Sequence, residues 1–76
     1  MTEIEWINIF SNKLVTMMKD SKITQAELAD SSGLSRSTIN DYIHKRKVPG
    51  YKAIINLSYA LDCTTDDLIE FGERIW

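Results

Sequence analysis

Two helix-start signals flank a single glycine near the middle of the chain. Thr24 is followed three residues later by Glu27, the spacing of a capping box, in which each side chain bonds the backbone N–H of the other residue. Gly33 suits the left-handed conformation that ends a helix, and Ser35 is a good cap for a following helix. The sequence therefore predicts two short helices joined by a tight turn at Gly33.

Each of these helices has an apolar side and a polar side. In the first, Leu28 and Ala29 are expected to face inward. The second is predicted to run from about Arg36 to His44, with apolar positions at Ile39, Tyr42 and Ile43. Its remaining positions are mostly polar: Arg36, Ser37, Thr38, Asn40 and Asp41. We expect this second helix to bury one side and to present short polar side chains on the other.

The rest of the chain has helical periodicity, and no segment alternates like a strand. One helical face is predicted at Ile4, Ile7, Phe10, Leu14 and Met17/Met18, followed by a turn at Asp20–Lys22. Another falls within residues 51–61, at Ile54, Leu57, Ser58 and Leu61. A capping box at Thr64 and Asp67 precedes a last short helix with Leu68, Ile69 and Phe71. The fold class is thus all-α, with five short helices in a single domain over residues 1–76.

The size and composition of the chain exclude several classes of function. With 76 residues the core is thin, so an enclosed catalytic cavity is not expected. One His and one Cys cannot supply a four-ligand zinc site, and no serine has a histidine–acid partner, so no metal, cofactor, small-molecule substrate or enzymatic activity is expected. Cys63 is expected to be a small core residue. The apolar runs are too short to cross a membrane and the acidic start is unlike a signal peptide, which favours a cytoplasmic protein.

The charge is unevenly distributed along the chain. The formal net charge is −2. Residues 36–52, however, carry five basic side chains against Asp41 alone, a net charge of +4, which leaves −6 for the remainder. A short basic stretch is typical of a nucleic-acid contact, and it is also compatible with a solvated loop.

The motif residues resemble a known family. The runs Ile23–Ala29 and Gly33–Ile39, followed by Tyr42, are similar to the phage Cro/lambda-repressor-like (XRE) helix-turn-helix family. The similarity extends to Phe10, Leu14 and Met18 and to Ala60–Leu68, and so covers about residues 8–70. It implies a lambda-repressor-like DNA-binding domain in which helices 2 and 3 form the helix-turn-helix and helix 3 enters the major groove.

The resemblance also implies contact residues. The positions that reach DNA bases in this family correspond to Arg36, Ser37 and Asp41. Those near the DNA backbone correspond to Gln25, Ser35, Thr38, His44, Lys45, Arg46 and Lys47. The chemistry agrees, since arginine pairs with guanine O6 and N7, and aspartate accepts from a cytosine amino group. Asp41 has an alternative role as an ion-pair partner of Arg36 or Lys45. The family often has glycine where Lys45 stands, so this helix is expected to end in a strained cap or in a different way.

The expected function is a sequence-specific transcriptional regulator of double-stranded DNA, a phage or prophage repressor acting as a homodimer. Four apolar residues are left over by the predicted core: Trp6, Phe71, Ile75 and Trp76. Phe71, Ile75 and Trp76 either fold back onto the first helix near Trp6 or form an apolar patch for a partner chain, and we favour the second interpretation. The alternative function is a protein-interaction module on the same fold, of the antirepressor or antitoxin type, which the acidic remainder of the chain favours.

Overall fold

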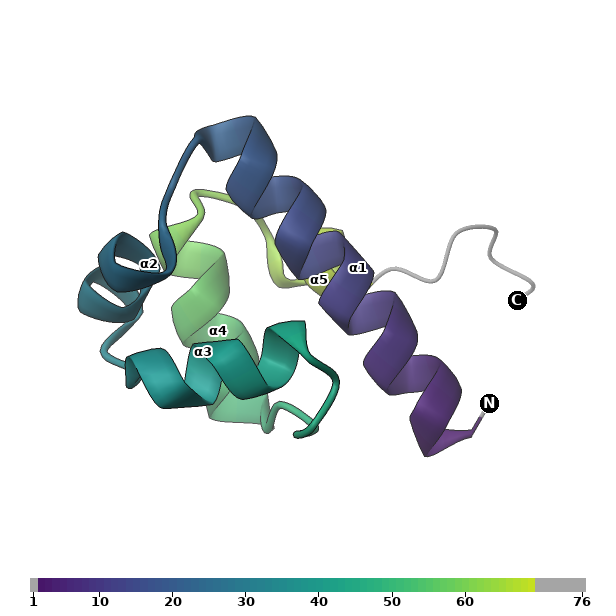
Figure 1. Ribbon diagram of the computed structural model, residues 1–76. Coiled ribbons are helices and arrows are strands. Elements are labelled where there is room, and N and C mark those ends of the chain that lie inside the picture. The colour runs from purple at the N-terminus through teal and green to yellow at the C-terminus, as the bar shows by residue number, and fades with distance from the viewer. Residues whose placement is uncertain (1, 70–76) are drawn as a thin grey trace.

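A computed structural model of the chain describes residues 2–69 and contains five α-helices (Figure 1). They are α1 (Glu3–Ser21), α2 (Gln25–Ser32), α3 (Arg36–Ile43), α4 (Tyr51–Ala60) and α5 (Thr65–Ile69). Residues 2–69 contain no strand, so the predicted all-α class is confirmed. No helix in this part of the chain combines the length and the apolar character needed to span a membrane.

The predicted capping signals form the helix ends. The N–H of Glu27 donates to Thr24 Oγ1 at 3.1 Å, and the N–H of Thr24 donates to Glu27 Oε1 at 2.9 Å. The backbone N–H of Thr24 stabilises the carboxylate and holds the pKa of Glu27 below its usual range. Thr64 and Asp67 form the second predicted box, with bonds of 3.0 and 3.2 Å. These reciprocal bonds occupy N–H groups that have no partner inside their own helix.

The first helix is longer than the sequence predicted. A capping box at Thr2 and Glu5 starts α1 before its apolar periodicity begins. The prediction that Ile4 belongs to the buried face is wrong, because Ile4 is 72% exposed. The turn predicted at Asp20–Lys22 is only one residue long, since the helix continues to Ser21 and Lys22 alone reverses the chain, with φ of 55°.

The core draws residues from all five helices. Six large apolar side chains are almost completely buried: Phe10, Leu14, Leu28, Ile39, Leu57 and Leu68. The predicted positions Ile54, Ser58 and Leu61 are also buried, and Cys63 is half-buried against the same cluster. Burial and the neighbouring carboxylates Asp67 and Asp62 raise the pKa of the Cys63 thiol. Phe71 lies outside the described residues.

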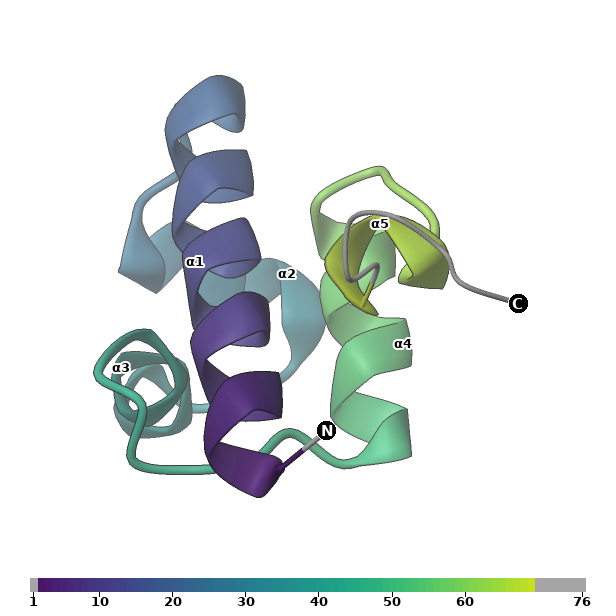
Figure 2. The same ribbon diagram turned by 90° about the vertical axis from the view of Figure 1, so that its right-hand side faces the viewer.

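Two packing relationships decide where α3 lies. Helix α3 packs against α1 and α2, whereas α4 packs against α2 and α5. Figure 2 accordingly shows α3 apart from α4 and α5. The side of α3 turned away from α1 and α2 is therefore open to solvent.

Gly33 joins α2 to α3 in the predicted left-handed conformation. Its φ is 73°, and its N–H donates to the carbonyl of Ala29 at 3.0 Å. Apart from Gly33 and its two chain neighbours, no atom lies within 4 Å of the place where a Cβ would stand, so backbone strain is what opposes a side chain here. A Gly33→Ala variant should therefore lose about 1–2 kcal/mol of the free energy of unfolding, measured by chemical denaturation. Gly33→Asn is the matched control and should lose less, because asparagine tolerates this conformation better; equal losses would contradict a purely conformational cause.

Candidate nucleic-acid interface

Helix α3 buries two of its own side chains in the core and is exposed on the opposite side. Ile39 is fully buried and Tyr42 is 5% exposed. The ring of Tyr42 meets Phe10 of α1 edge to face, with ring centroids 5.6 Å apart. Arg36 and Ser37 are exposed at the start of the helix. This arrangement anchors one side of α3 in the core and leaves Arg36 and Ser37 of its first turn accessible to a ligand.

Side-chain hydrogen bonds define the start of α3. The N–H of Thr38 donates to Ser35 Oγ at 3.0 Å, which confirms Ser35 as the cap. The hydroxyl of Ser35 donates in turn to Thr38 Oγ1 at 2.8 Å. In the preceding turn the N–H of Leu34 donates to the buried Ser32 Oγ at 3.3 Å. Ser35 and Thr38 therefore order the beginning of α3.

The end of α3 is fixed by a residue that the sequence analysis did not identify. Ser11 of α1 is 1% exposed, and its hydroxyl donates to the carbonyl of Ile43 at 2.8 Å. This carbonyl belongs to the last turn of α3, where carbonyls have no partner inside the helix. The available signal was a small polar residue directly beside the buried Phe10. Ser11 thus ties the far end of α3 to α1.

A Ser11→Ala variant should lose about 1–3 kcal/mol of the free energy of unfolding, because the partly buried hydrogen bond to the carbonyl of Ile43 is lost and this carbonyl is left without its donor. Ser58→Ala is a matched control, since the Ser58 hydroxyl is also buried but bonds the carbonyl of Ile55 within its own helix, at 2.7 Å. We expect a smaller loss there. Hydrogen exchange at the end of α3 should accelerate only in Ser11→Ala, and similar exchange in both variants would contradict this role.

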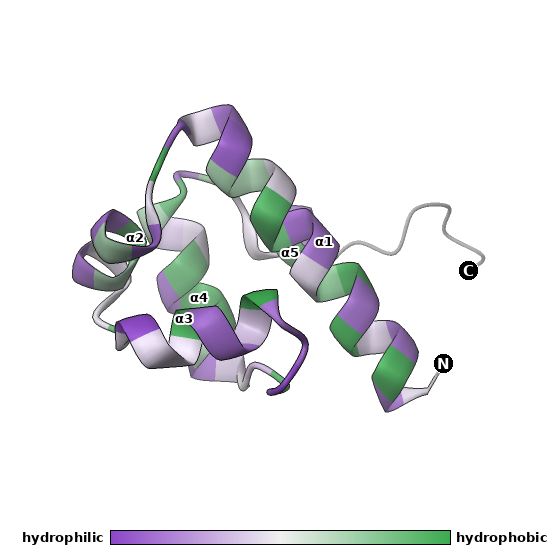
Figure 3. Ribbon diagram, in the orientation of Figure 1, coloured by the Kyte–Doolittle hydropathy of each residue, from purple (hydrophilic) through white to green (hydrophobic). Residues whose placement is uncertain are grey.

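The three basic residues after α3, Lys45, Arg46 and Lys47, form what we call the basic loop, which begins with a strained residue. Lys45 has φ of 61°, so the chain ends α3 in the left-handed cap expected for glycine but places a lysine there. The N–H of Lys45 donates to the carbonyl of Tyr42, and the N–H of Arg46 donates to the carbonyl of Asp41 at 2.8 Å. Lys45, Arg46 and Lys47 are all exposed. Figure 3 shows this loop as a continuous hydrophilic segment directly after α3.

Asp41 forms ion pairs, as in its alternative role, but with other partners than those predicted. Its Oδ1 accepts from Arg46 Nε at 3.0 Å, and its Oδ2 lies 3.7 Å from Lys47 Nζ. The partner predicted for this alternative role was Arg36 or Lys45. Arg36 precedes Asp41 by five residues, which separates the two side chains by about 140° around the helix. The left-handed turn at Lys45 directs the next two residues back to the last turn of α3.

The other predicted contact residues lie at the two ends of α3 and at the start of α2. His44 is exposed, and its Nδ1 lies 2.9 Å from the carbonyl of Asn40. Gln25 is half-buried as the first residue of α2, and it lines a hollow of about 410 Å³ together with Ile43. The structure thus brings Gln25 near the end of α3, although the two are far apart in the sequence.

Helix α3 packs on α2 and exposes its first turn, which is the geometry of a helix-turn-helix. Comparison with known proteins also indicates a helix-turn-helix domain. Residues 13–73 match the Cro/C1-type HTH DNA-binding domain. The chain belongs to this family. The helix-turn-helix of this Cro/C1-type domain consists of α2, the turn at Gly33 and α3. The family indicated by the sequence is therefore confirmed.

Individual relatives are similar over most of this Cro/C1-type domain. YqaE of Bacillus subtilis strain 168, an uncharacterized HTH-type transcriptional regulator, is 36% identical over 70 residues. The aligned region is 90% of this chain and 60% of YqaE, so the chain spans less than two thirds of that relative's length.

Two solved structures have the same fold. The restriction-modification controller protein C.AhdI from Aeromonas hydrophila has a TM-score of 0.79 and 26% identity, over 82% of this chain and 94% of C.AhdI. The SOS-response transcriptional repressor LexA from Eubacterium rectale has a TM-score of 0.82 and 29% identity, over 99% of this chain and 81% of the LexA structure.

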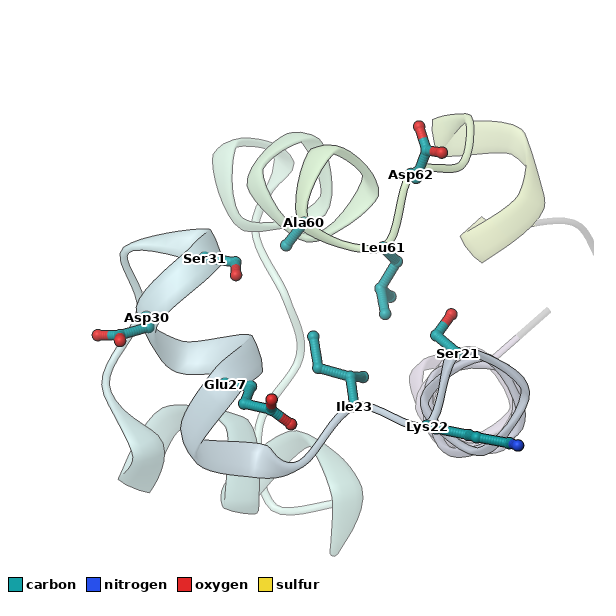
Figure 4. Close-up of a pocket in the computed structure, with 9 residues that line it drawn as sticks. All are labelled: Ser21, Lys22, Ile23, Glu27, Asp30, Ser31, Ala60, Leu61 and Asp62. Atoms are coloured by element: carbon teal, nitrogen blue, oxygen red, sulfur yellow. The ribbon is translucent and has the colours of Figure 1, made fainter.

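A second hollow of this Cro/C1-type domain has the opposite chemistry to the basic loop. It has a volume of about 450 Å³, with Ile23 and Leu61 near its centre (Figure 4). Its lining includes the acidic residues Glu27, Asp30 and Asp62 and the basic residue Lys22, and it contains no residue of α3 or of residues 44–50. The carboxylates of Asp30 and Asp62 point outward from the hollow (Figure 4). Three acidic residues against one lysine give this surface a net negative charge that repels phosphate, so DNA contact is not expected here. This hollow therefore lies apart from the predicted DNA-contact residues.

Proposed function

We propose that this Cro/C1-type domain is a sequence-specific transcriptional regulator that reads double-stranded DNA with α3. The observation that carries the proposal is the two-sided character of α3, with Ile39 and Tyr42 buried beneath it and Arg36 and Ser37 exposed. The major groove of B-DNA is wide enough to admit an α-helix. A helix fixed in this way presents its first turn to base edges.

The proposed contacts divide into two groups. Arg36, Ser37 and Asp41 contact base edges, and Arg36 is suited to the O6 and N7 of a guanine. Contacts to the DNA backbone are assigned to Gln25, Ser35, Thr38, His44, Lys45, Arg46 and Lys47. The basic loop supplies the largest share of charge, so binding should weaken steeply as salt increases.

We propose further that the protein binds as a homodimer and represses transcription by occupying an operator, as phage and prophage repressors do. One α3 reaches only a few base pairs, and two copies on half-sites about 34–36 Å apart double the recognised sequence. Support comes from the name of one similar structure, a transcriptional repressor, and from that of YqaE, a transcriptional regulator.

Selection from random duplexes, followed by sedimentation of the selected complex, tests this proposal. The expected result is a palindromic sequence that binds two chains, with affinity falling steeply between two salt concentrations. Absence of enrichment at ~50 mM salt, where phosphate contacts are strong, would contradict the proposal and favour a protein-interaction module. A complex with one chain per selected duplex would contradict the homodimer alone.

A further inference from the structure

One carboxylate of α3 holds two cations of the basic loop. Asp41 is 23% exposed at its side chain, and it accepts from Arg46 Nε at 3.0 Å with Lys47 Nζ at 3.7 Å. The backbone N–H of Arg46 also donates to the carbonyl of Asp41, at 2.8 Å. This backbone bond fixes the loop beside the carboxylate, so the ion pairs are preorganised.

The two cations remain available for exchange. The side chains of Arg46 and Lys47 are 54% and 56% exposed. Ion pairs with such exposed partners contribute little to stability and are readily replaced by other partners. DNA phosphates are such partners, and each phosphate neutralised by a lysine or arginine strengthens the salt dependence of binding. Asp41 and the DNA backbone therefore compete for the same two side chains.

We propose that Asp41 is a specificity-determining residue because its ion pairs keep Arg46 and Lys47 from contacting DNA phosphates until a base binds to Asp41 in place of the two cations. This inference rests on the proposed DNA-binding function. At a matched site, an amino group such as cytosine N4 donates to the carboxylate and releases both cations to the backbone. At an unmatched site no donor is offered, so moving the cations to phosphates leaves the Asp41 carboxylate without a partner, and non-specific binding is weaker.

The test is Asp41→Asn, which keeps the shape of the side chain and removes its charge. Affinities of the full chain are measured across a series of salt concentrations, for a random duplex and for the selected site. We expect tighter binding to the random duplex, and a plot of log affinity against log salt that is steeper by up to about 2, since each released cation adds about 0.9. The ratio of specific to non-specific affinity should fall.

Asp30→Asn is the matched control, because Asp30 is exposed on α2 and lines the acidic hollow instead of the α3 face. It makes the same change in net charge. Equal slopes and equal random-duplex affinities in the two variants would overturn the proposal. Such a result would mean that Asp41 affects DNA binding only through the net charge of the protein.

A measurement without DNA separates this proposal from the proposed function. The NMR resonance of the Arg46 Nε–H should move in Asp41→Asn and stay in place in Asp30→Asn. An unmoved resonance overturns the holding role of Asp41 even if a palindrome is selected. A moved resonance and a steeper slope without any selected sequence would leave the holding role intact and contradict sequence-specific regulation. Failure of the wild type and of Asp41→Asn to bind any duplex would overturn both.

Discussion

An Ile39→Ala variant is expected to lose about 2–5 kcal/mol of the free energy of unfolding. Ile39 is fully buried, and α3 packs against both α1 and α2. Truncation removes apolar surface from the core and leaves a cavity that a small domain closes only in part. Because such domains have total stabilities of about 5–15 kcal/mol, the loss is a large fraction of the whole. Chemical denaturation followed by circular dichroism measures it.

Ile4→Ala is the matched control for this prediction. It makes the same change in residue type at a position that is 72% exposed in α1, so the expected change is within about 0.5 kcal/mol. Under conditions where both variants stay folded, only Ile39→Ala should also weaken DNA binding, because its cavity lies beneath α3. Similar losses of stability in both variants would contradict the assigned burial.

The features that were predicted correctly from the sequence depend on residues that are close together along the chain. The capping box at Thr24 and Glu27, the left-handed Gly33 and the cap at Ser35 each involve a few consecutive residues. Such signals can be read without knowledge of the fold, because the hydrogen bonds they form are local. They placed α2, the turn and α3 correctly, and periodicity then identified Ile39 and Tyr42 as buried.

Periodicity was less informative at the ends of α1. It shows which side of a helix is apolar, but not how far along that side another element covers it. Ile4 continues the pattern of Ile7 and Phe10, yet it lies in the first turn and remains exposed. Phe71, Ile75 and Trp76, which we associated with a dimer contact, lie outside the described residues.

The interactions that shape the candidate site depend on the three-dimensional fold. Ser11 and Ile43 are 32 residues apart, and only the packing of α1 on α3 brings them together. The partners of Asp41 depend on the left-handed conformation of Lys45, which propensity disfavours for a residue with a side chain. The exposed positions of Arg36 and Ser37 at the start of α3 were predictable from the motif, whereas the hydrogen bonds and ion pairs at the end of α3 were not.

Arg36→Ala is expected to weaken binding to the selected operator by about 10- to 100-fold, which corresponds to about 1–3 kcal/mol. Arg36 is the first residue of α3 and is exposed, and it is therefore placed for a bidentate contact with guanine. Loss of that contact removes recognition at one base pair, so selection with the variant should return a sequence that is relaxed at that position. Fluorescence anisotropy with a labelled duplex at fixed salt measures the affinity.

Two control variants separate base reading from simple charge. Arg36→Lys keeps the charge but lacks the planar fork, so it should retain random-duplex affinity and lose part of the operator affinity. Lys13→Ala removes one positive charge from a hollow that Lys13 lines with Asp67 of α5, away from α3, and should leave operator affinity nearly unchanged. If Arg36→Ala weakened operator and random duplexes equally, Arg36 would be a phosphate contact, and the base preference would have to come from Ser37 and Asp41.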